Sequence, residues 1–213
     1  MERSYIDMSK NRKVSHKIYE SWEYEREIDD LNRMSEQGWQ LEKGGCFHSV
    51  FIKNDKEKYI YQIDYSPKLK DKDRYLEMFS EQEWEYINST FNGWHYFKKA
   101  YRDDMSEEEK IIYTDKQSLY EMQNRYLSML KFFMIISCIM TPVYLILGII
   151  GRQTSILLEA LAFLIMGVYM GIGLINVNRV RNDKSKIPHV PFIVAYPIMM
   201  IMIIFAIVLL FIQ

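Results

Sequence analysis

The chain has 213 residues, with 27 Lys and Arg against 28 Asp and Glu, and 49% of its residues are hydrophobic. Up to Arg125 there are 21 basic and 26 acidic side chains, a net charge of −5; from Tyr126 onward there are 6 and 2, a net charge of +4. This uneven composition excludes a disordered chain, a strongly basic nucleic-acid binder and a simple soluble enzyme.

Cysteine and histidine usage gives no sign of a disulfide framework or a metal site. Cys46 and Cys138 fall in different parts of the chain, and the four histidines have no metal-ligand spacing. Residues 1–17 are charged and lack an apolar core, so no signal peptide is expected. We therefore expect no cofactor and no metal, and membrane insertion would depend on later segments.

The first part of the chain contains an internal repeat. Residues 35–41 match residues 80–86 around a shared Ser-Glu-Gln-x-Trp, an offset of 45 residues (35 to 80). Alternating apolar residues predict a strand at 59–65, with a weaker counterpart at 14–19. Tyr24, Ile28 and Leu31 have helical spacing, and Gly38 offers a helix end.

Each repeat unit is therefore predicted to be strand–helix–strand–strand, with third strands at 46–53 and 93–101. The units cover about residues 13–55 and 58–101, within an α+β domain that occupies residues 1–105. We expect the strands to form one sheet with the helices on one face.

A helical connector is predicted over residues 106–131. Capping-box patterns occur at Ser106-x-x-Glu109 and Thr114-x-x-Gln117, and neither Pro nor Gly follows Asp115 until Pro142. One helix is therefore expected to run from the domain into the first membrane span. Leu119, Met122 and Tyr126 form an apolar stripe that packs either on the domain or on a second copy of the chain, and three turns leave both open.

Three apolar runs, at 132–150, 155–177 and 191–212, predict transmembrane helices within residues 132–213. A hydrocarbon core of about 30 Å needs about 20 such residues in a helix. Within these runs only Glu159 is charged, and we interpret it as an acid near the outer interface rather than a site. Gly167 and Gly171 form a GxxxG motif for close helix packing, within the chain rather than with a second copy.

The loop charges predict the orientation. Only Arg152 lies between the first two spans, whereas Arg179, Arg181, Lys184 and Lys186 lie between the second and third. Basic loops stay in the cytoplasm. We therefore expect a multi-pass protein of the cell membrane, with its N-terminal domain in the cytoplasm, its C-terminus outside and the lipid bilayer as a partner.

Five short motifs carry a resemblance to a known family: Leu31-Asn32-x-Met34, Gly38-Trp39-x-Leu41, Tyr59-x-Tyr61-x-Ile63-Asp64, Gly93-Trp94-x-Tyr96-Phe97 and Ile112-Tyr113-Thr114-Asp115. With Trp22 they resemble the domain of unknown function 2812 (DUF2812) family over residues 13–125. The resemblance implies a bacterial protein, often with membrane spans after the domain, and gene neighbours that encode PadR-type transcriptional repressors. It implies no catalytic residues. The repeat plan is also similar in topology to the drug-binding domains of GyrI-like proteins.

Aromatic residues offer a candidate recognition surface. We place a ligand or partner surface at Trp22, Trp94, Glu20 and Glu85, because an aromatic cleft with an acid suits an amphipathic or cationic molecule. Core packing is the alternative for both tryptophans. Trp39 and Trp84, which are equivalent in the repeat, are expected to be core anchors, and Asp64 is expected to pair locally.

The favoured function is a membrane-anchored regulatory or sensory protein. Its cytoplasmic domain would bind a ligand or a protein, such as a PadR-type repressor, and couple that event to the membrane. Direct contact with nucleic acid is not expected from a domain of net charge −5. The alternative is a non-catalytic accessory or immunity subunit of a membrane transporter complex. An enzyme is disfavoured, because no nucleophile is paired with a base and no metal cluster is present in the sequence pattern.

Overall fold

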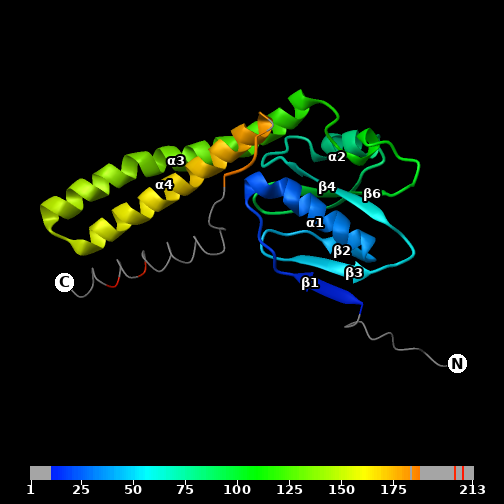
Figure 1. The fold of residues 1–213 in the computed structure, drawn as a ribbon, viewed down its shortest axis with the longest axis horizontal. Helices are drawn as coiled ribbons and strands as arrows, with labels where there is room; N and C mark the ends of the chain where they lie inside the picture. The colour runs from blue at the N-terminus through cyan, green and yellow to red at the C-terminus, as the bar shows by residue number, and fades with distance from the viewer. Residues whose placement is uncertain (1–10, 183, 188–203, 205–207, 209–213) are drawn as a thin grey trace. The chain divides into compact units, whose positions relative to one another are not determined.

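The computed structural model describes residues 11–182, 184–187, 204 and 208. It divides into two compact units, Met1–Arg125 and Tyr126–Gln213. The first is an α+β unit and the second contains long apolar helices (Figure 1), which confirms the coarse fold class expected from the sequence.

Within residues 11–125, the part of it that the structure describes, the α+β unit contains six strands and two α-helices ahead of the start of α3. Their order along the chain is β1 Arg12–Ser15, α1 Tyr24–Glu36, β2 Trp39–Lys43, β3 Ser49–Lys53, β4 Tyr59–Tyr65, α2 Lys72–Ser80, β5 Glu85–Ser89 and β6 Trp94–Ala100. Two short 3-10 helices are also present, η1 Ser21–Glu23 before α1 and η2 Glu108–Lys110 after β6. The strand predicted at 59–65 coincides with β4, whereas the one predicted at 14–19 lies earlier, at β1.

The strands form two antiparallel sheets, in the orders β1-β3-β2 and β4-β6-β5. The prediction of a single sheet is therefore wrong. The reason lies at β4, whose outward edge is occupied by side chains of α1. The Asn32 amide accepts from the Tyr61 N–H (2.7 Å) and donates to the Tyr61 carbonyl (3.4 Å), and Ser35 Oγ accepts from the Tyr59 N–H (3.0 Å). Such cover keeps an edge strand from pairing further.

The second sheet and α2 enclose a hydrophobic core. Ile60, Phe79, Trp84 and Phe97 pack together there, and Met105 and Ile112 from the following segment join them. Trp84 is 2% exposed, as expected for a core anchor. Trp39 is not its equivalent, since it is only half-buried, with Lys13 and Lys53 ammonium groups 5.6 and 5.4 Å from its ring centre.

Residues 106–115 are not the start of a continuous helix. Ser106 and Glu109 form the predicted reciprocal cap, but it opens only η2. The following helix, α3, spans Lys116–Gly151 and contains Pro142. Its N-terminus is capped by Asp115, which accepts from the Ser118 N–H at 2.8 Å, rather than by the predicted Thr114. From Lys116 onward α3 is one continuous helix through the first apolar run, as predicted.

α3 and α4 (Thr154–Arg181) are each long and apolar enough to cross a membrane. Within the second unit they lie side by side as a hairpin (Figure 1), with Tyr144 and Phe163 ring centres 5.4 Å apart. A Cβ on Gly167 would lie 3.0 Å from Ser137 Cβ, so this glycine sits against α3, whereas Gly171 has open space around it. The predicted third span, 191–212, falls outside the described residues apart from two positions.

Candidate functional site

A groove of about 350 Å³ lies between α1 and the strands β1 and β3. Helix α1 packs mainly on β2 and β4, which leaves this side of the first sheet open. Leu31, Met34 and Phe51 give the groove an apolar lining, with Tyr19 and Glu27 among its polar residues. We call this space the α1 groove. Its size and mixed lining are those of a small-molecule site.

Glu27 is the unusual residue of the α1 groove. Its side chain accepts a hydrogen bond from the Tyr96 hydroxyl at 2.7 Å. Burial raises the pKa of the Glu27 carboxyl to about 7, and the charge of Asp30 adds to the rise, while the Tyr96 hydrogen bond opposes it. Among the described residues, no Lys or Arg forms an ion pair with Glu27. The carboxyl is thus left without a cation and is close to half-protonated at neutral pH.

Asp30, one helical turn along, has the opposite environment. It is paired with Lys17 at 2.7 Å and Arg33 at 2.9 Å, and it accepts from the Tyr19 hydroxyl at 2.6 Å. Burial acts against ionisation, but these partners lower the pKa of the Asp30 carboxyl. Lys17 and Arg33 are therefore engaged by Asp30, and Lys13, the third basic side chain of the lining, donates to Met34 Sδ at 3.9 Å; none of the three forms an ion pair with Glu27.

A smaller cavity of about 40 Å³ shares Tyr19 and Glu27 with the α1 groove. Trp94, Tyr96 and Cys46 also line it. Tyr96 is fixed by close packing: a Cβ on Gly44 would lie 2.5 Å from its ring, so only glycine fits there. Burial and the neighbouring Glu27 charge raise the pKa of the Tyr96 phenol, which therefore stays protonated and donates to Glu27.

The four predicted surface residues do not form one surface. Glu20 and Trp94 both line the smaller cavity and are 7% and 8% exposed. Trp22 is 4% exposed and belongs to η1, outside the linings of these two cavities. Glu85 lies on β5 with its side chain 65% exposed and paired with Lys98 at 3.1 Å. The structure thus brings Glu20 and Trp94 together and leaves Glu85 apart from them.

Glu27, Tyr19 and Tyr96 were not predicted as site residues. A signal for Glu27 is present in the sequence, since it is spaced three residues from Tyr24 and four from Leu31 and so falls on the buried stripe of α1. An acid on an apolar stripe must be paired or shift its pKa. The pairing of Glu27 with Tyr96 joins α1 to β6 and could not be read from local spacing.

A second polar cluster holds the start of α3 within the α+β unit. Asp64, 1% exposed, accepts from the Tyr75 hydroxyl at 2.6 Å, from the Tyr113 hydroxyl and from Arg125 Nη2 at 2.9 Å. Arg125 Nε also donates to the Tyr65 carbonyl at 2.6 Å. Asp64 is paired as predicted, but its partners are distant in the sequence rather than local. A buried carboxylate held by three donors is a strong anchor.

The start of α3 also contacts the smaller cavity. Gln123 Nε2 donates to the hydroxyl of Tyr24 at 3.1 Å, and Tyr24 is part of the cavity lining. Tyr24 in turn stacks on Trp94, with ring centres 6.1 Å apart. Gln123 of α3 therefore contacts Tyr24, which lines the same cavity as Glu27.

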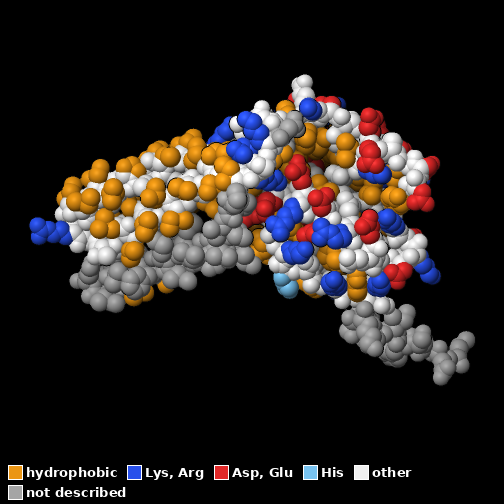
Figure 2. Space-filling model, viewed as in Figure 1, with side chains coloured by type: hydrophobic (Ala, Val, Ile, Leu, Met, Phe, Trp, Pro, Cys, Tyr) orange, Lys and Arg blue, Asp and Glu red, His pale blue; other side chains and the backbone are white. Residues whose placement is uncertain are grey.

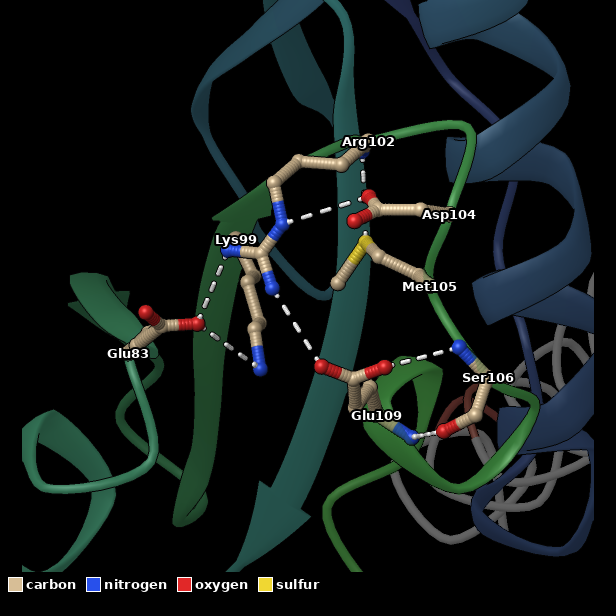
Figure 3. Close-up of polar contacts among 7 residues, drawn as sticks. All are labelled: Glu83, Lys99, Arg102, Asp104, Met105, Ser106 and Glu109. Carbon is tan, nitrogen blue, oxygen red and sulfur yellow. Dashed lines mark hydrogen bonds and ion pairs between the residues drawn. The ribbon is translucent and has the colours of Figure 1, made fainter.

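A third polar cluster lies at the C-terminal end of β6 (Figure 3). Arg102 pairs with Glu83 at 3.2 Å and with Glu109 at 3.2 Å, and Lys99 pairs with Glu83 at 3.4 Å. Each of these charges has a partner of opposite sign, so the cluster resembles a structural ion-pair network rather than a site. Within the described part of the chain, no group of three or more His, Cys, Asp or Glu is placed to hold a metal.

Comparison with known proteins gives one match. The family described as protein of unknown function (DUF2812) matches residues 23–136, which covers the α+β unit from α1 onward and the first part of α3. No curated protein and no solved structure matches the chain.

Proposed function

This chain belongs to the DUF2812 family of proteins of unknown function, and we propose that it is a membrane-anchored recognition protein whose α+β unit binds an amphipathic organic cation from the cytoplasm. The observation that carries the proposal is the carboxyl of Glu27, which lies in a groove with an apolar lining and has a pKa of about 7. A ligand with a positive charge beside an apolar body complements both features.

The energetics favour a cation over a neutral or anionic ligand. An isolated carboxylate is costly to bury, so Glu27 holds a proton near neutral pH instead. A ligand cation would restore the charged form and take up the Coulomb interaction that no Lys or Arg among the described residues supplies. Leu31, Met34 and Phe51 would contribute hydrophobic burial, and Tyr19 would contribute an aromatic face.

The proposed membrane topology keeps this site in the cytoplasm. α3 and α4 would be the first two spans, and the basic residues Arg179 and Arg181 in the last turn of α4 favour a cytoplasmic end there. Single cysteines at Gln153 and Lys184, in a chain without Cys46 and Cys138, can be labelled in intact cells with a membrane-impermeant reagent. Labelling at Gln153 but not at Lys184 is expected; the reverse pattern would invert the orientation.

Coupling would pass through the start of α3. Arg125 ties this helix to Asp64, and Gln123 ties it to Tyr24 beside the smaller cavity. A ligand that displaces Tyr24 or Trp94 would change what Gln123 contacts, and the continuous helix α3 would carry that change. A cytoplasmic protein, such as a PadR-type repressor, would then read the bound state.

The duplication of the α+β unit is also part of the proposal. Both halves have the strand order first–third–second. Residues with positive φ occur at Gly38 (78°) and Glu83 (66°), which are equivalent at the repeat offset. The register shifts of β2 and β5, after Leu41 and Tyr86, are equivalent in the same way. These matched irregularities favour descent from one supersecondary unit.

Binding of a fluorescent lipophilic cation tests the ligand site. Rhodamine 6G is titrated into the full chain in detergent and its anisotropy is compared with that of the uncharged dye Nile red. Glu27→Gln should weaken rhodamine 6G binding roughly tenfold or more, a loss of about 1.4 kcal/mol, and leave Nile red binding unchanged. Glu36→Gln is the matched control, because Glu36 is exposed on the same helix and pairs only at 3.8 Å with Lys58.

Equal binding of rhodamine 6G by the native chain and by Glu27→Gln would contradict the ligand proposal. The second candidate, an accessory subunit of a membrane complex, would then be favoured. Purification of the full chain from membranes at native level separates the two: a transporter subunit as main partner supports the accessory function, and a soluble repressor supports the regulatory one.

A further inference from the structure

The smaller cavity adjoins the α1 groove, because Tyr19 and Glu27 line both spaces. The two spaces differ in size. The smaller cavity, of about 40 Å³, holds about three water-sized groups at roughly 10–15 Å³ each, whereas the α1 groove, of about 350 Å³, can hold the body of a small organic molecule. A ligand bound at the Glu27 carboxyl can therefore have a compact head in one space and a larger body in the other.

The smaller cavity is lined by acids without bases. Glu20 and Glu27 both border it, and the described residues of its lining include no Lys, Arg or His. Arg26, which precedes Glu27 in the sequence, pairs instead with Glu23 at 3.6 Å. The outer surface of the α+β unit is different, since Figure 2 shows basic and acidic side chains interspersed over it. The smaller cavity therefore favours a positively charged group.

Two phenols that border the smaller cavity have already given their hydrogen atoms to carboxylates. The Tyr19 hydroxyl donates to Asp30 at 2.6 Å, and the Tyr96 hydroxyl donates to Glu27 at 2.7 Å. Burial and these neighbouring acids raise the pKa of both phenols, so they keep their protons at neutral pH. Towards a ligand, each hydroxyl oxygen can then act only as a hydrogen-bond acceptor.

These acceptors suit an ammonium group better than an alkylated cation. An ammonium group has three N–H donors and no acceptor, which matches the carboxylates of Glu20 and Glu27 and the two phenolic oxygens. A trimethylammonium group carries the same charge but donates no hydrogen bond from N–H. Its four heavy atoms also exceed the three or so water-sized groups that the smaller cavity holds. Charge alone would admit both groups, whereas hydrogen bonding and size favour the first.

We propose that the ligand is a primary amine whose ammonium head enters the smaller cavity beside Glu20 and Glu27, while its apolar body stays in the α1 groove. This inference rests on the proposed function and narrows it from amphipathic cations in general to primary amines. The stacked rings of Tyr24 and Trp94 line the same cavity, so the ammonium head reaches the aromatic pair that Gln123 contacts through Tyr24.

Competition between two amines with the same body tests the head group. Rhodamine 6G bound to the full chain in detergent is displaced with 4-phenylbutylamine and, separately, with its N,N,N-trimethyl derivative, at about pH 7.5, where each carries one positive charge. The primary amine should displace the dye at a concentration at least about tenfold lower. Equal displacement by the two compounds would overturn the inference and leave the cation proposal standing. Displacement by neither would contradict the cation proposal itself.

Two variants test where the ammonium head lies. Glu20 lines only the smaller cavity, whereas Glu27 lines both spaces. Glu20→Gln should therefore remove the preference for the primary amine, and Glu27→Gln should weaken the binding of both compounds. Glu36→Gln, exposed on α1, is the matched control and should keep the native preference.

Unchanged tryptophan fluorescence shows that Glu20→Gln is folded. A tenfold preference for the primary amine that survives in folded Glu20→Gln would overturn the placement of the head in the smaller cavity. Should this variant fail to fold, the comparison of the two amines on the native chain decides the inference by itself.

Discussion

The two halves of the α+β unit share a plan but use their helices differently. In the second half, α2 covers its own sheet and places Phe79 beside Trp84 and Phe97 in a hydrophobic core. In the first half, α1 covers the edge strand β4 of the other sheet through Asn32 and Ser35. The first sheet is therefore left with an open side, and the α1 groove lies there.

This difference shows how two halves with the same strand order can have different structural roles. The second half supplies the hydrophobic cluster around Phe97, whereas in the first half α1 contacts both sheets and borders a groove. Glu27 is tolerated in the first half because it lies at the border of that groove. The equivalent position in the second half, Lys72, is exposed at the start of α2.

The largest expected effect concerns the paired tryptophans. Trp84→Ala removes a side chain that is 2% exposed and should lower the free energy of unfolding by about 3–5 kcal/mol. Trp39→Ala should cost about 1–2 kcal/mol, because Trp39 is half-buried beneath Lys13 and Lys53. All four tryptophans lie before Arg125, so the fluorescence of those remaining reports urea unfolding of this unit in the full chain. Equal losses of unfolding free energy in the two variants would contradict this expectation and show that Trp39 and Trp84 are equivalent core residues.

Glu27 gives the next largest effect, through pH. Its pKa rises from 4.5 to about 7 on folding, so between these values the unfolded chain releases a proton that the folded chain keeps. The Glu27 contribution to the free energy of unfolding therefore falls as pH rises from about 4.5 to about 7, by at most about 3 kcal/mol. Glu27→Gln should be more stable than the native chain above pH 7 and equal to it below pH 4.5.

Thermal unfolding followed by tryptophan fluorescence at both pH extremes checks this expectation, and Glu36→Gln should track the native chain throughout. A destabilised Glu27→Gln at high pH would show that the charged carboxylate is stabilising and that the pKa of Glu27 is not raised. The proposed cation should bind more tightly above pH 7, where the carboxylate is available. It should therefore raise the thermal transition of the native chain more at high pH than at low pH.

Local signals in the sequence predicted local structure well. The strand β4, the helix end at Gly38 and the long helix from Lys116 all follow from alternation, glycine placement and the absence of helix breakers. Family membership also followed from short motifs. The division into two sheets did not, because it depends on one amide, that of Asn32, reaching the backbone of a strand 29 residues later.

The candidate site was predicted only in part, for the same reason. Glu20 and Trp94 were named from composition and do line the smaller cavity, whereas Glu85 is exposed on β5 and paired with Lys98. Glu27 and Tyr96 meet across 69 residues, and Asp64 meets Arg125 across 61. Such long-range polar pairs have no periodicity, and a single sequence cannot reveal them.

The third prediction concerns the hydrogen bonds by which Asn32 of α1 joins the first half to β4 of the second. Asn32→Ala leaves the N–H and carbonyl of Tyr61 without their partner, which should cost about 2 kcal/mol. Asn54→Ala is the control of identical chemistry, because its amide bonds Glu57 at the exposed surface, and it should cost much less. The measurement is urea unfolding of the full chain. Should both variants lose the same small amount, α1 would not depend on this bridge to cover β4.

The smallest effects concern the two helix ends that follow α1 and α2, at equivalent positions. Gly38 has a φ of 78°, and a Cβ there would also clash with the Asp55 carboxylate. Gly38→Ala should therefore destabilise the unit by about 1–2 kcal/mol, the cost of a left-handed conformation for an L-residue. Asp55 is exposed and can move, so the clash itself adds little.

Glu83 has the same conformation, with a φ of 66°, but it is not glycine and pairs with Lys99 and Arg102. Glu83→Gly should relieve the backbone strain and lose these pairs, so the thermal transition should change little at low salt. In about 1 M NaCl the screening length falls to about 3 Å and the pairs lose most of their effect. There the relief of strain should dominate and Glu83→Gly should unfold at a higher temperature than the native chain, whereas Gly38→Ala should remain destabilised at both salt concentrations. A lower transition temperature for Glu83→Gly in high salt would mean that the left-handed conformation at residue 83 carries no strain. Glutamate would then terminate α2 at no greater energetic cost than glycine terminates α1.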